Sequence, residues 1–85
     1  MTNEKLLKII TTIFHSVFKN QNINLNINSN PENTLGWDSL NHILFIIEIE
    51  KHFSIKFTAG EILSNKNIGQ ICDSINSKLD KKNIT

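Results

Sequence analysis

The sequence lacks the features that mark several large classes of proteins. It contains a single cysteine, Cys72, so no disulfide forms within the chain, and this favours a reducing, cytoplasmic compartment. Its charge is nearly balanced, with 9 Lys and Arg residues against 8 Asp and Glu residues, and the basic residues are scattered. Because binding to a phosphate backbone requires a basic stripe or patch, we expect no nucleic-acid partner.

Long apolar runs are also absent. Lys5, Lys8 and Lys19 interrupt the apolar residues near the N-terminus, so neither the core of a signal peptide nor a membrane span fits this stretch. The three histidines have no spacing to Cys72 that suits a metal ion, and a structural zinc would need more ligands. We therefore expect no membrane insertion and no bound metal.

The composition that remains is that of a small, folded, helical domain. The 85 residues leave room for one domain, residues 1–85, with a modest core, and 39% of them are hydrophobic. Apolar residues recur every three or four positions, as in amphipathic helices. We predict an all-α bundle of three main helices and one short helix, with a long loop after the first helix. The helices are expected over residues 3–19, 39–53, 58–64 and 67–79, the loop over 20–38 and a frayed tail over 80–85.

The segment 20–38 is rich in asparagine and alternates polar residues with Ile23, Leu25 and Ile27. Alternation of this kind is typical of a strand, but a lone strand would have no partner in this chain. We therefore predict a long loop that its three aliphatic side chains pin to the helices. A loop of this length in a small domain usually has a function.

The predicted helix over 39–53 carries two apolar faces. The first face consists of Phe45, Ile46, Ile49 and Phe53. The second face consists of Leu40, Ile43, Leu44 and Ile47. A helix in so small a bundle needs only one apolar stripe, and we assign the first face to the core because it leads into Ile55 and Phe57. Two interpretations remain for the second face: it is an exposed docking surface, or the helix is buried on all sides.

The pentapeptide Gly36-Trp37-Asp38-Ser39-Leu40 joins the loop to this helix. It places a primary hydroxyl at a helix start, where unpaired N–H groups and the helix dipole favour negative charge. We expect Asp38 to cap the helix and Ser39 to be open to covalent modification. The simple alternative is that Ser39 is an ordinary capping serine.

From Leu35 the chain reads Leu-Gly-Trp-Asp-Ser-Leu, and the apolar helix that follows ends in Glu-Ile-Glu-Lys-His-Phe at Phe53. With these segments in this order, the chain resembles the acyl carrier proteins over nearly its whole length. The resemblance implies that a phosphopantetheinyl transferase (holo-acyl-carrier-protein synthase) attaches 4′-phosphopantetheine from coenzyme A to Ser39, with Asp38 supporting the attachment. It also implies a small carrier, expected to be a monomer, that holds acyl or aminoacyl groups as thioesters and catalyses no reaction itself.

The expected partners of such a carrier are acyl-activating, acyltransferase or synthase enzymes. The residues expected to face them are Leu40, Asn41, Ile43, Leu44, Ile47, Glu48 and Lys51. Carriers of fatty acid synthesis are usually acidic along this helix, whereas this chain is nearly neutral. We therefore favour a stand-alone carrier of a specialised biosynthetic pathway. The alternatives are a housekeeping carrier of fatty acid synthesis and an unmodified helical adaptor that binds a partner through Leu40, Leu44 and Ile47.

A hydrolase is the competing enzymatic interpretation, because Asp38, Ser39 and His42 are the residue types of a catalytic triad. A triad needs its base oriented by a third group, and Asp38 adjoins the serine in the chain, so it is poorly placed to orient His42. Gly-Asp-Ser-Leu hydrolases have a larger α/β fold, and here Trp37 interrupts their motif. We therefore expect no catalytic residue, and the role of Trp37 stays open between packing over the loop and contact with the prosthetic arm.

Overall fold

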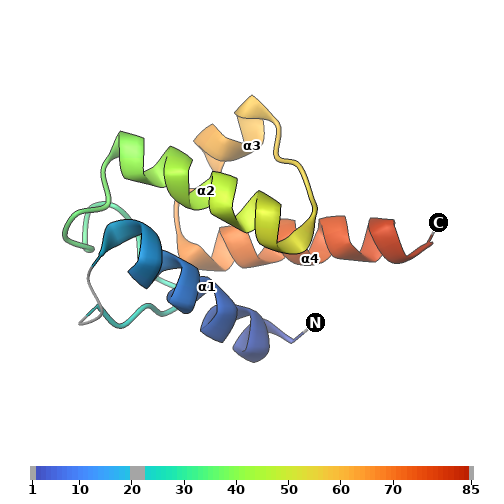
Figure 1. The fold of residues 1–85 in the computed structure, drawn as a ribbon, viewed down its shortest axis with the longest axis horizontal. Coiled ribbons are helices and arrows are strands. Elements are labelled where there is room, and N and C mark those ends of the chain that lie inside the picture. Colours follow the sequence, from blue (N-terminus) through green and yellow to red (C-terminus); the bar gives the residue numbers. More distant parts are fainter. Residues whose placement is uncertain (1, 20–22, 85) are drawn as a thin grey trace.

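The computed structural model describes residues 2–19 and 23–84, with side chains described to residue 81. Within these residues the regular structure is entirely helical. The helices are α1 (Asn3–Phe18), α2 (Ser39–Phe53), α3 (Ala59–Ser64) and α4 (Ile68–Ile84) (Figure 1). The predicted bundle of three main helices and one short helix is confirmed, with the long loop between α1 and α2.

The last helix is longer than the sequence pattern predicted. We expected an end at residue 79 and a frayed tail, whereas α4 continues to Ile84. No glycine or proline follows Gly69, so no residue of the usual stop types ends the helix. Leu79, half-buried against the core, also anchors the helix beyond its middle.

The core combines one apolar stripe from each of the three long helices. Its fully buried side chains are Leu6, Ile10 and Phe14 of α1, Phe45, Ile46 and Ile49 of α2, and Ile68, Ile71, Cys72 and Ile75 of α4. The face of α2 that we assigned to the core is therefore buried, and Ile55 and Phe57 extend the core beyond the helix. The period of 3.6 residues explains this, because it keeps each stripe on one side of its helix.

The loop is held to the helices by fewer side chains than expected. Leu25 is buried and Ile23 is half-buried, but Ile27 is 52% exposed, so the prediction for Ile27 was wrong. His15 of α1 contributes an anchor of another kind, because its Nε2 donates to the carbonyl of Ile23 over 2.7 Å.

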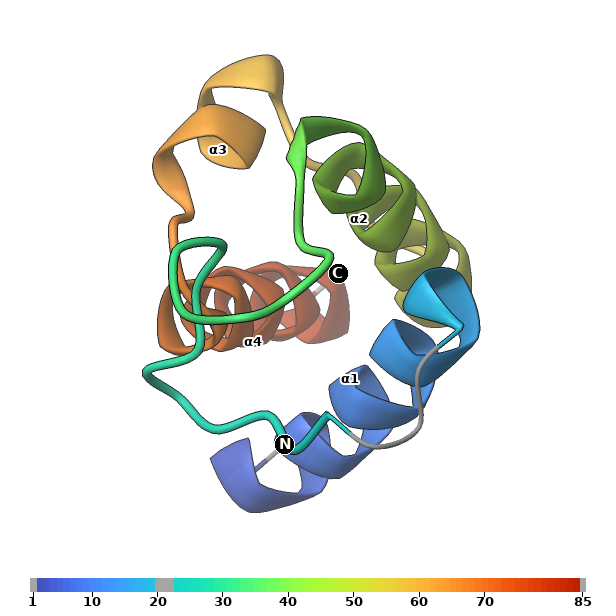
Figure 2. The ribbon, with the colours of Figure 1, turned by 90° about the vertical axis from the view of Figure 1, so that its left-hand side faces the viewer.

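The loop backbone caps the start of α4. Figure 2 views α4 nearly end-on and shows the loop crossing that end. The N–H groups of Ile68 and Gly69 donate to the carbonyls of Ser29 and Ile27, over 3.0 Å and 2.9 Å. These are donors that a helix start leaves unpaired. Gly69 favours this close approach, because a Cβ there would lie only 3.1 Å from the Ile27 oxygen.

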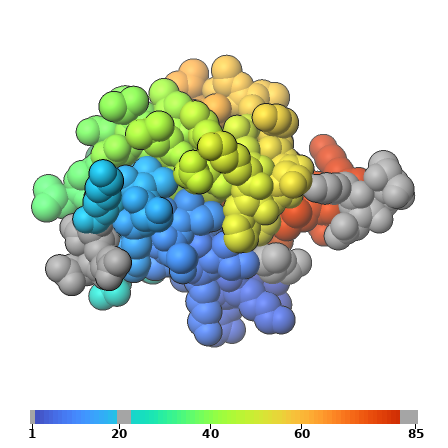
Figure 3. Space-filling model, in the orientation of Figure 1, coloured from blue at the N-terminus to red at the C-terminus, as the bar shows by residue number. Residues whose placement is uncertain are grey.

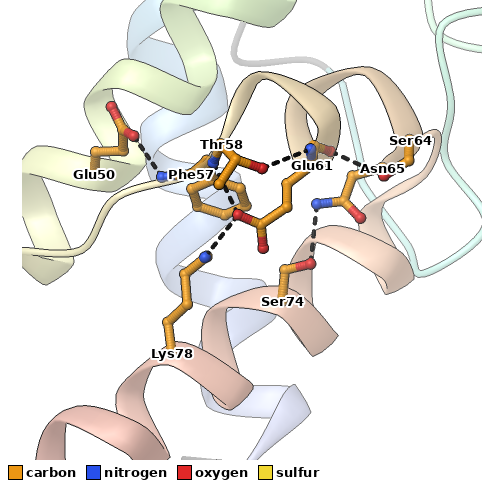
Figure 4. A network of polar contacts seen from close by, with 8 residues as sticks. All are labelled: Glu50, Phe57, Thr58, Glu61, Ser64, Asn65, Ser74 and Lys78. Atoms are coloured by element: carbon orange, nitrogen blue, oxygen red, sulfur yellow. Dashed lines mark hydrogen bonds and ion pairs between the residues drawn. The ribbon is translucent and has the colours of Figure 1, made fainter.

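Polar contacts hold the short helix α3 in place (Figure 4). Thr58 and Glu61 form a capping box at its start. On the α2 side, Glu50 Oε2 accepts from the N–H of Phe57 over 2.7 Å. On the α4 side, Glu61 Oε1 accepts from Lys78 Nζ over 2.9 Å. The contact with Lys78, followed by that with the Thr58 N–H, lowers the pKa of Glu61 from its ordinary 4.5.

The replacement Lys78→Met should remove this ion pair. The free energy of unfolding should then fall less between neutral and acid pH than it does in the wild type. A carboxylate whose pKa is lowered in the folded state contributes stability above its ordinary pKa, and that contribution is lost as the pH falls through the folded value. We expect urea unfolding near neutral pH to show a loss of about 1 kcal/mol or less, and the difference from wild type to vanish well below pH 4.5. The exposed Lys81→Met is the matched control, and an equal loss at both pH values would contradict the assignment.

Candidate functional site

Ser39 is the first residue of α2 and is exposed. The residue before it, Asp38, is the N-cap, and its Oδ1 accepts from the N–H of Asn41 over 2.8 Å. Capping is therefore carried out by Asp38, as predicted, and Ser39 is not the capping residue. Among the described residues, no group forms a hydrogen bond with Ser39 Oγ, so the hydroxyl faces solvent without a structural role.

A tight turn sets the direction in which α2 begins. Gly36 has a φ of 86°, a conformation that residues with a Cβ rarely adopt. Its carbonyl accepts from the N–H of Asp38 over 3.1 Å and from Asn41 Nδ2 over 2.9 Å. Asn41 is half-buried by this contact. Its side-chain amide therefore holds the turn closed.

Trp37 lies in the core, 3% exposed, and not on the surface of the loop. Its ring meets Phe14 and Phe45 edge to face, with centroids 5.6 Å and 5.9 Å apart. Of the two roles left open by the sequence, packing is the one that the contacts show. Trp37 is nonetheless one of the residues that line the groove described below.

A chain of hydrogen bonds links the loop, α2 and α3 through His42. Trp37 Nε1 donates to His42 Nδ1 over 3.0 Å, and His42 Nε2 donates to the carbonyl of Ile62 over 3.0 Å. We call this the Trp37–His42–Ile62 relay. It requires the neutral tautomer that carries its proton on Nε2. Both ring nitrogens are engaged with groups other than Ser39, so His42 is not placed as a base for that hydroxyl.

A groove of about 770 Å³ opens beside Ser39. It lies between the start of α2, the helix α3 and the loop, which Figure 2 shows around one end of the molecule. Its α3 side, with Ile62, Leu63 and the segment Asn65–Asn67, was missed by the sequence reasoning. No sequence motif indicates these residues, because they are distant from Ser39 in the chain and only the fold brings them close to it.

The second apolar face of α2 is exposed. Leu40 is 66% exposed and Ile47, the least exposed of the four, is 38% exposed. Burial on all sides is therefore the wrong interpretation of this helix. Figure 3 shows α2 on the surface of the molecule, next to α1. The charges beside this face largely cancel, because Lys51 Nζ lies 3.5 Å from Glu48 Oε1.

The other chemically active groups are remote from Ser39 or inert. Cys72 is buried, and burial, assisted by the charge of Asp73, raises the pKa of its thiol to about 11. Among the described residues, no three His, Cys, Asp or Glu side chains are grouped to hold a metal ion. No helix in the described part of the chain is long and apolar enough to cross a membrane.

Comparison with known proteins identifies the family. The model of the phosphopantetheine attachment site family matches residues 8–75. The solution structure of the holo acyl carrier protein from Geobacter metallireducens superimposes with a TM-score of 0.83 at 37% sequence identity, over 89% of this chain and 87% of that chain. The chain belongs to the acyl carrier protein family. No curated protein matches it.

The site fits the prosthetic group of the acyl carrier family, 4′-phosphopantetheine. Ser39 offers an exposed hydroxyl without a competing hydrogen bond among the described residues. A phosphodiester at this position would lie near unpaired N–H groups and the positive end of the helix dipole. The adjoining groove gives a tethered arm a surface to lie on.

The turn before α2 should depend on Gly36. The change Gly36→Ala puts a Cβ on a residue with positive φ, which we expect to lower the free energy of unfolding by about 1 kcal/mol. Gly60→Ala is the matched control, since its Cβ would meet only Thr58 Oγ1 at an ordinary 3.9 Å inside a helix. It should be neutral or stabilising by up to about 1 kcal/mol. Equal urea midpoints for the two variants would contradict the role of Gly36.

Proposed function

We propose that this member of the acyl carrier family is a stand-alone carrier whose 4′-phosphopantetheine arm is attached at Ser39. It serves a specialised biosynthetic pathway and catalyses no reaction itself. The observation that carries the proposal is the exposed Ser39 Oγ, placed at the first residue of α2 and relieved of capping by Asp38. When bound, the arm supplies a terminal thiol that holds acyl or aminoacyl groups as thioesters.

Attachment requires Ser39 Oγ to form a bond to the phosphorus next to the pantetheine of coenzyme A. The pyrophosphate bond breaks, and adenosine 3′,5′-bisphosphate leaves. The hydroxyl proton must pass to a base on the transferase, because His42 has both ring nitrogens engaged in the relay. Asp38 remains exposed while its Oδ1 caps α2, so its negative charge is available to the transferase.

The proposed partner surface is the exposed face of α2 with the residues beside it. It comprises Leu40, Asn41, Ile43, Leu44, Ile47, Glu48 and Lys51. Glu48 and Lys51 pair with each other, and Glu50 is turned inward to the N–H of Phe57. Little net charge is left to steer a basic partner, so apolar contact should dominate recognition. This supports a specialised partner over the basic surfaces that meet acidic carriers of fatty acid synthesis.

Intact-mass measurement tests the attachment site. After incubation with coenzyme A and a broad-specificity phosphopantetheinyl transferase, the wild type should gain the mass of one phosphopantetheine. Ser39→Ala should gain none, and Ser77→Ala, which alters an exposed serine of α4, should be modified like the wild type. A second readout is the native thiol titration, which should rise from none to one because Cys72 is buried and protonated.

Two outcomes would contradict this proposal. One is an unmodified wild type under conditions that load a control carrier, which would favour the unmodified adaptor. The other is severe unfolding of Ser39→Ala, which would show that the serine is structural. We expect its melting to stay close to that of the wild type, because the cap is Asp38.

The exposed face should govern the encounter with the transferase. We expect Leu44→Asp to lower kcat/KM for modification about fivefold or more, since it places a charge in an apolar contact. Ile27→Asp is the control, because Ile27 is equally apolar and 52% exposed but belongs to the loop. Helical circular dichroism should be unchanged in both variants. Equal rates for the two would show that α2 is not the contact surface.

A further inference from the structure

The three histidines differ in what their ring nitrogens bond. His42 Nδ1 accepts from Nε1 of Trp37, a residue that is only 3% exposed, over 3.0 Å. His15 Nε2 donates to the Ile23 carbonyl, because a carbonyl can only accept. His52 is exposed. A second ring proton leaves the bond of His15 intact, whereas on His42 it puts a donor where the indole needs an acceptor.

Protonation of His42 therefore acts on the two ends of the Trp37–His42–Ile62 relay in opposite ways. Its Nε2–H continues to donate to the Ile62 carbonyl, and the positive charge strengthens that bond. Its protonated Nδ1 would face the indole N–H across 3.0 Å, so Trp37 would lose its acceptor. The ring must then move away from the indole while it stays bonded to α3. The loop side of the relay opens and the α3 side holds.

The indole cannot stabilise the charged ring through its π face. The planes of the His42 and Trp37 rings are inclined by 27°, and their centroids lie 5.9 Å apart. Because an N–H···N bond joins the two rings, they meet at their edges. A cation–π interaction needs the cation over the face of the ring. Protonation therefore removes a hydrogen bond from Trp37 without an aromatic contact in its place.

The charged groups around His42 are mostly exposed. Those that line the groove with it are Asp38 at the cap of α2, Glu32 of the loop and Lys66 beyond α3. Solvent and salt screen these three charges, and the single ammonium offsets part of the effect of the two carboxylates. On α3, Glu61 is paired with Lys78. One turn after His42 on α2 stand the buried apolar residues Phe45 and Ile46.

We propose that His42 is a pH-sensitive positioning residue for Ser39. In its neutral form it holds Trp37, and only the N-cap Asp38 separates Trp37 from the serine. On protonation it releases the indole, which loosens the turn before α2 and slows modification in mild acid. This effect on modification rests on the proposed attachment at Ser39. Since the unfolded chain accepts the proton without losing the relay, the free energy of unfolding should also fall as the pH falls.

An NMR titration of the unmodified protein tests the release without any enzyme. Between about pH 7.5 and about pH 5.5, the Nε1–H signal of Trp37, the sole tryptophan, should move in step with the ring signals of His42 and not with those of His15. It should move equally in the exposed control His52→Gln. In His42→Gln, which keeps a donor and an acceptor but does not titrate, it should stay in place.

Two results of this titration would overturn the proposal, whether or not His42→Gln folds. One is an indole signal that stays in place while the His42 ring becomes charged. The other is a His42 ring that remains neutral down to about pH 5.5 in the folded protein, because a group that does not titrate there cannot act as a switch in mild acid.

A competition experiment tests the effect on Ser39. Wild type and His42→Gln are mixed in equal amounts with coenzyme A and a broad-specificity phosphopantetheinyl transferase, and intact mass gives the initial rate of modification of each. Because both carriers share one enzyme, the pH dependence of the enzyme cancels in the ratio of their rates. The ratio of wild type to His42→Gln should fall several-fold from about pH 7.5 to about pH 5.5. The ratio of wild type to His52→Gln should stay constant.

The possible failures are distinguishable. A constant ratio of wild type to His42→Gln, with the indole signal moving, would show that release of Trp37 does not reach Ser39 and would overturn the positioning role. A wild type that is unmodified at both pH values would instead overturn attachment at Ser39, and with it the effect on modification. The titration of the unmodified protein would still decide whether His42 releases the indole.

Discussion

The burial of one indole ring constrains the arrangement of the whole site. Trp37 gains by leaving water, but its N–H needs an acceptor once it is buried. His42, the fourth residue of α2, supplies that acceptor. The same imidazole then has only a donor left, which it directs to the Ile62 carbonyl of α3. One polar requirement therefore joins the loop, α2 and α3, and it leaves Ser39 two residues beyond the packed ring.

At the start of α2, the side chains of Asp38 and Asn41 make the local hydrogen bonds, and Ser39 Oγ makes none among the described residues. The first N–H groups of a helix need acceptors, and the nearest acceptor is usually the side chain of the N-cap residue. Asp38 takes this part, while Asn41 bonds back to the Gly36 carbonyl and fixes the turn. A serine in the capping position would have its oxygen occupied. A serine one residue later belongs to the helix, and its hydroxyl is left accessible.

Local contacts were predictable from the sequence, and contacts between distant segments were not. The cap at Asp38 and the box of Thr58 and Glu61 each join residues three positions apart, so residue type and spacing are enough to predict them. The buried face of α2 was equally predictable, since helical periodicity separates its two apolar stripes. The exposure of the second stripe required the fold, because no periodicity tells whether a neighbouring helix covers it.

The interactions that the sequence did not reveal are mostly made by backbone groups. His42 meets a carbonyl twenty positions away, and nothing in the residue type of Ile62 indicates this. Ile27 has the apolar side chain of a pinning residue, yet its carbonyl makes the contact and its side chain stays exposed. Every residue carries the same backbone groups, so such contacts leave no trace in the composition. Gly69 is a partial exception, because its residue type gives some indication of such a backbone contact. A glycine at a helix start lacks a Cβ and so permits close approach of another chain segment.

The charges along α2 are largely used within the molecule, next to the exposed apolar face of this helix. Glu50 is used inside the molecule to hold the Phe57 N–H, and Glu48 is offset by Lys51. These two carboxylates then contribute little attraction for a basic partner over a distance, so association gains little acceleration from the charges along this part of α2. At the proposed partner surface, affinity would then come from desolvating Leu40, Leu44 and their neighbours after contact, which favours shape over charge as the basis of selection. A partner that recognises this carrier should therefore present an apolar depression, and its binding should change little with ionic strength.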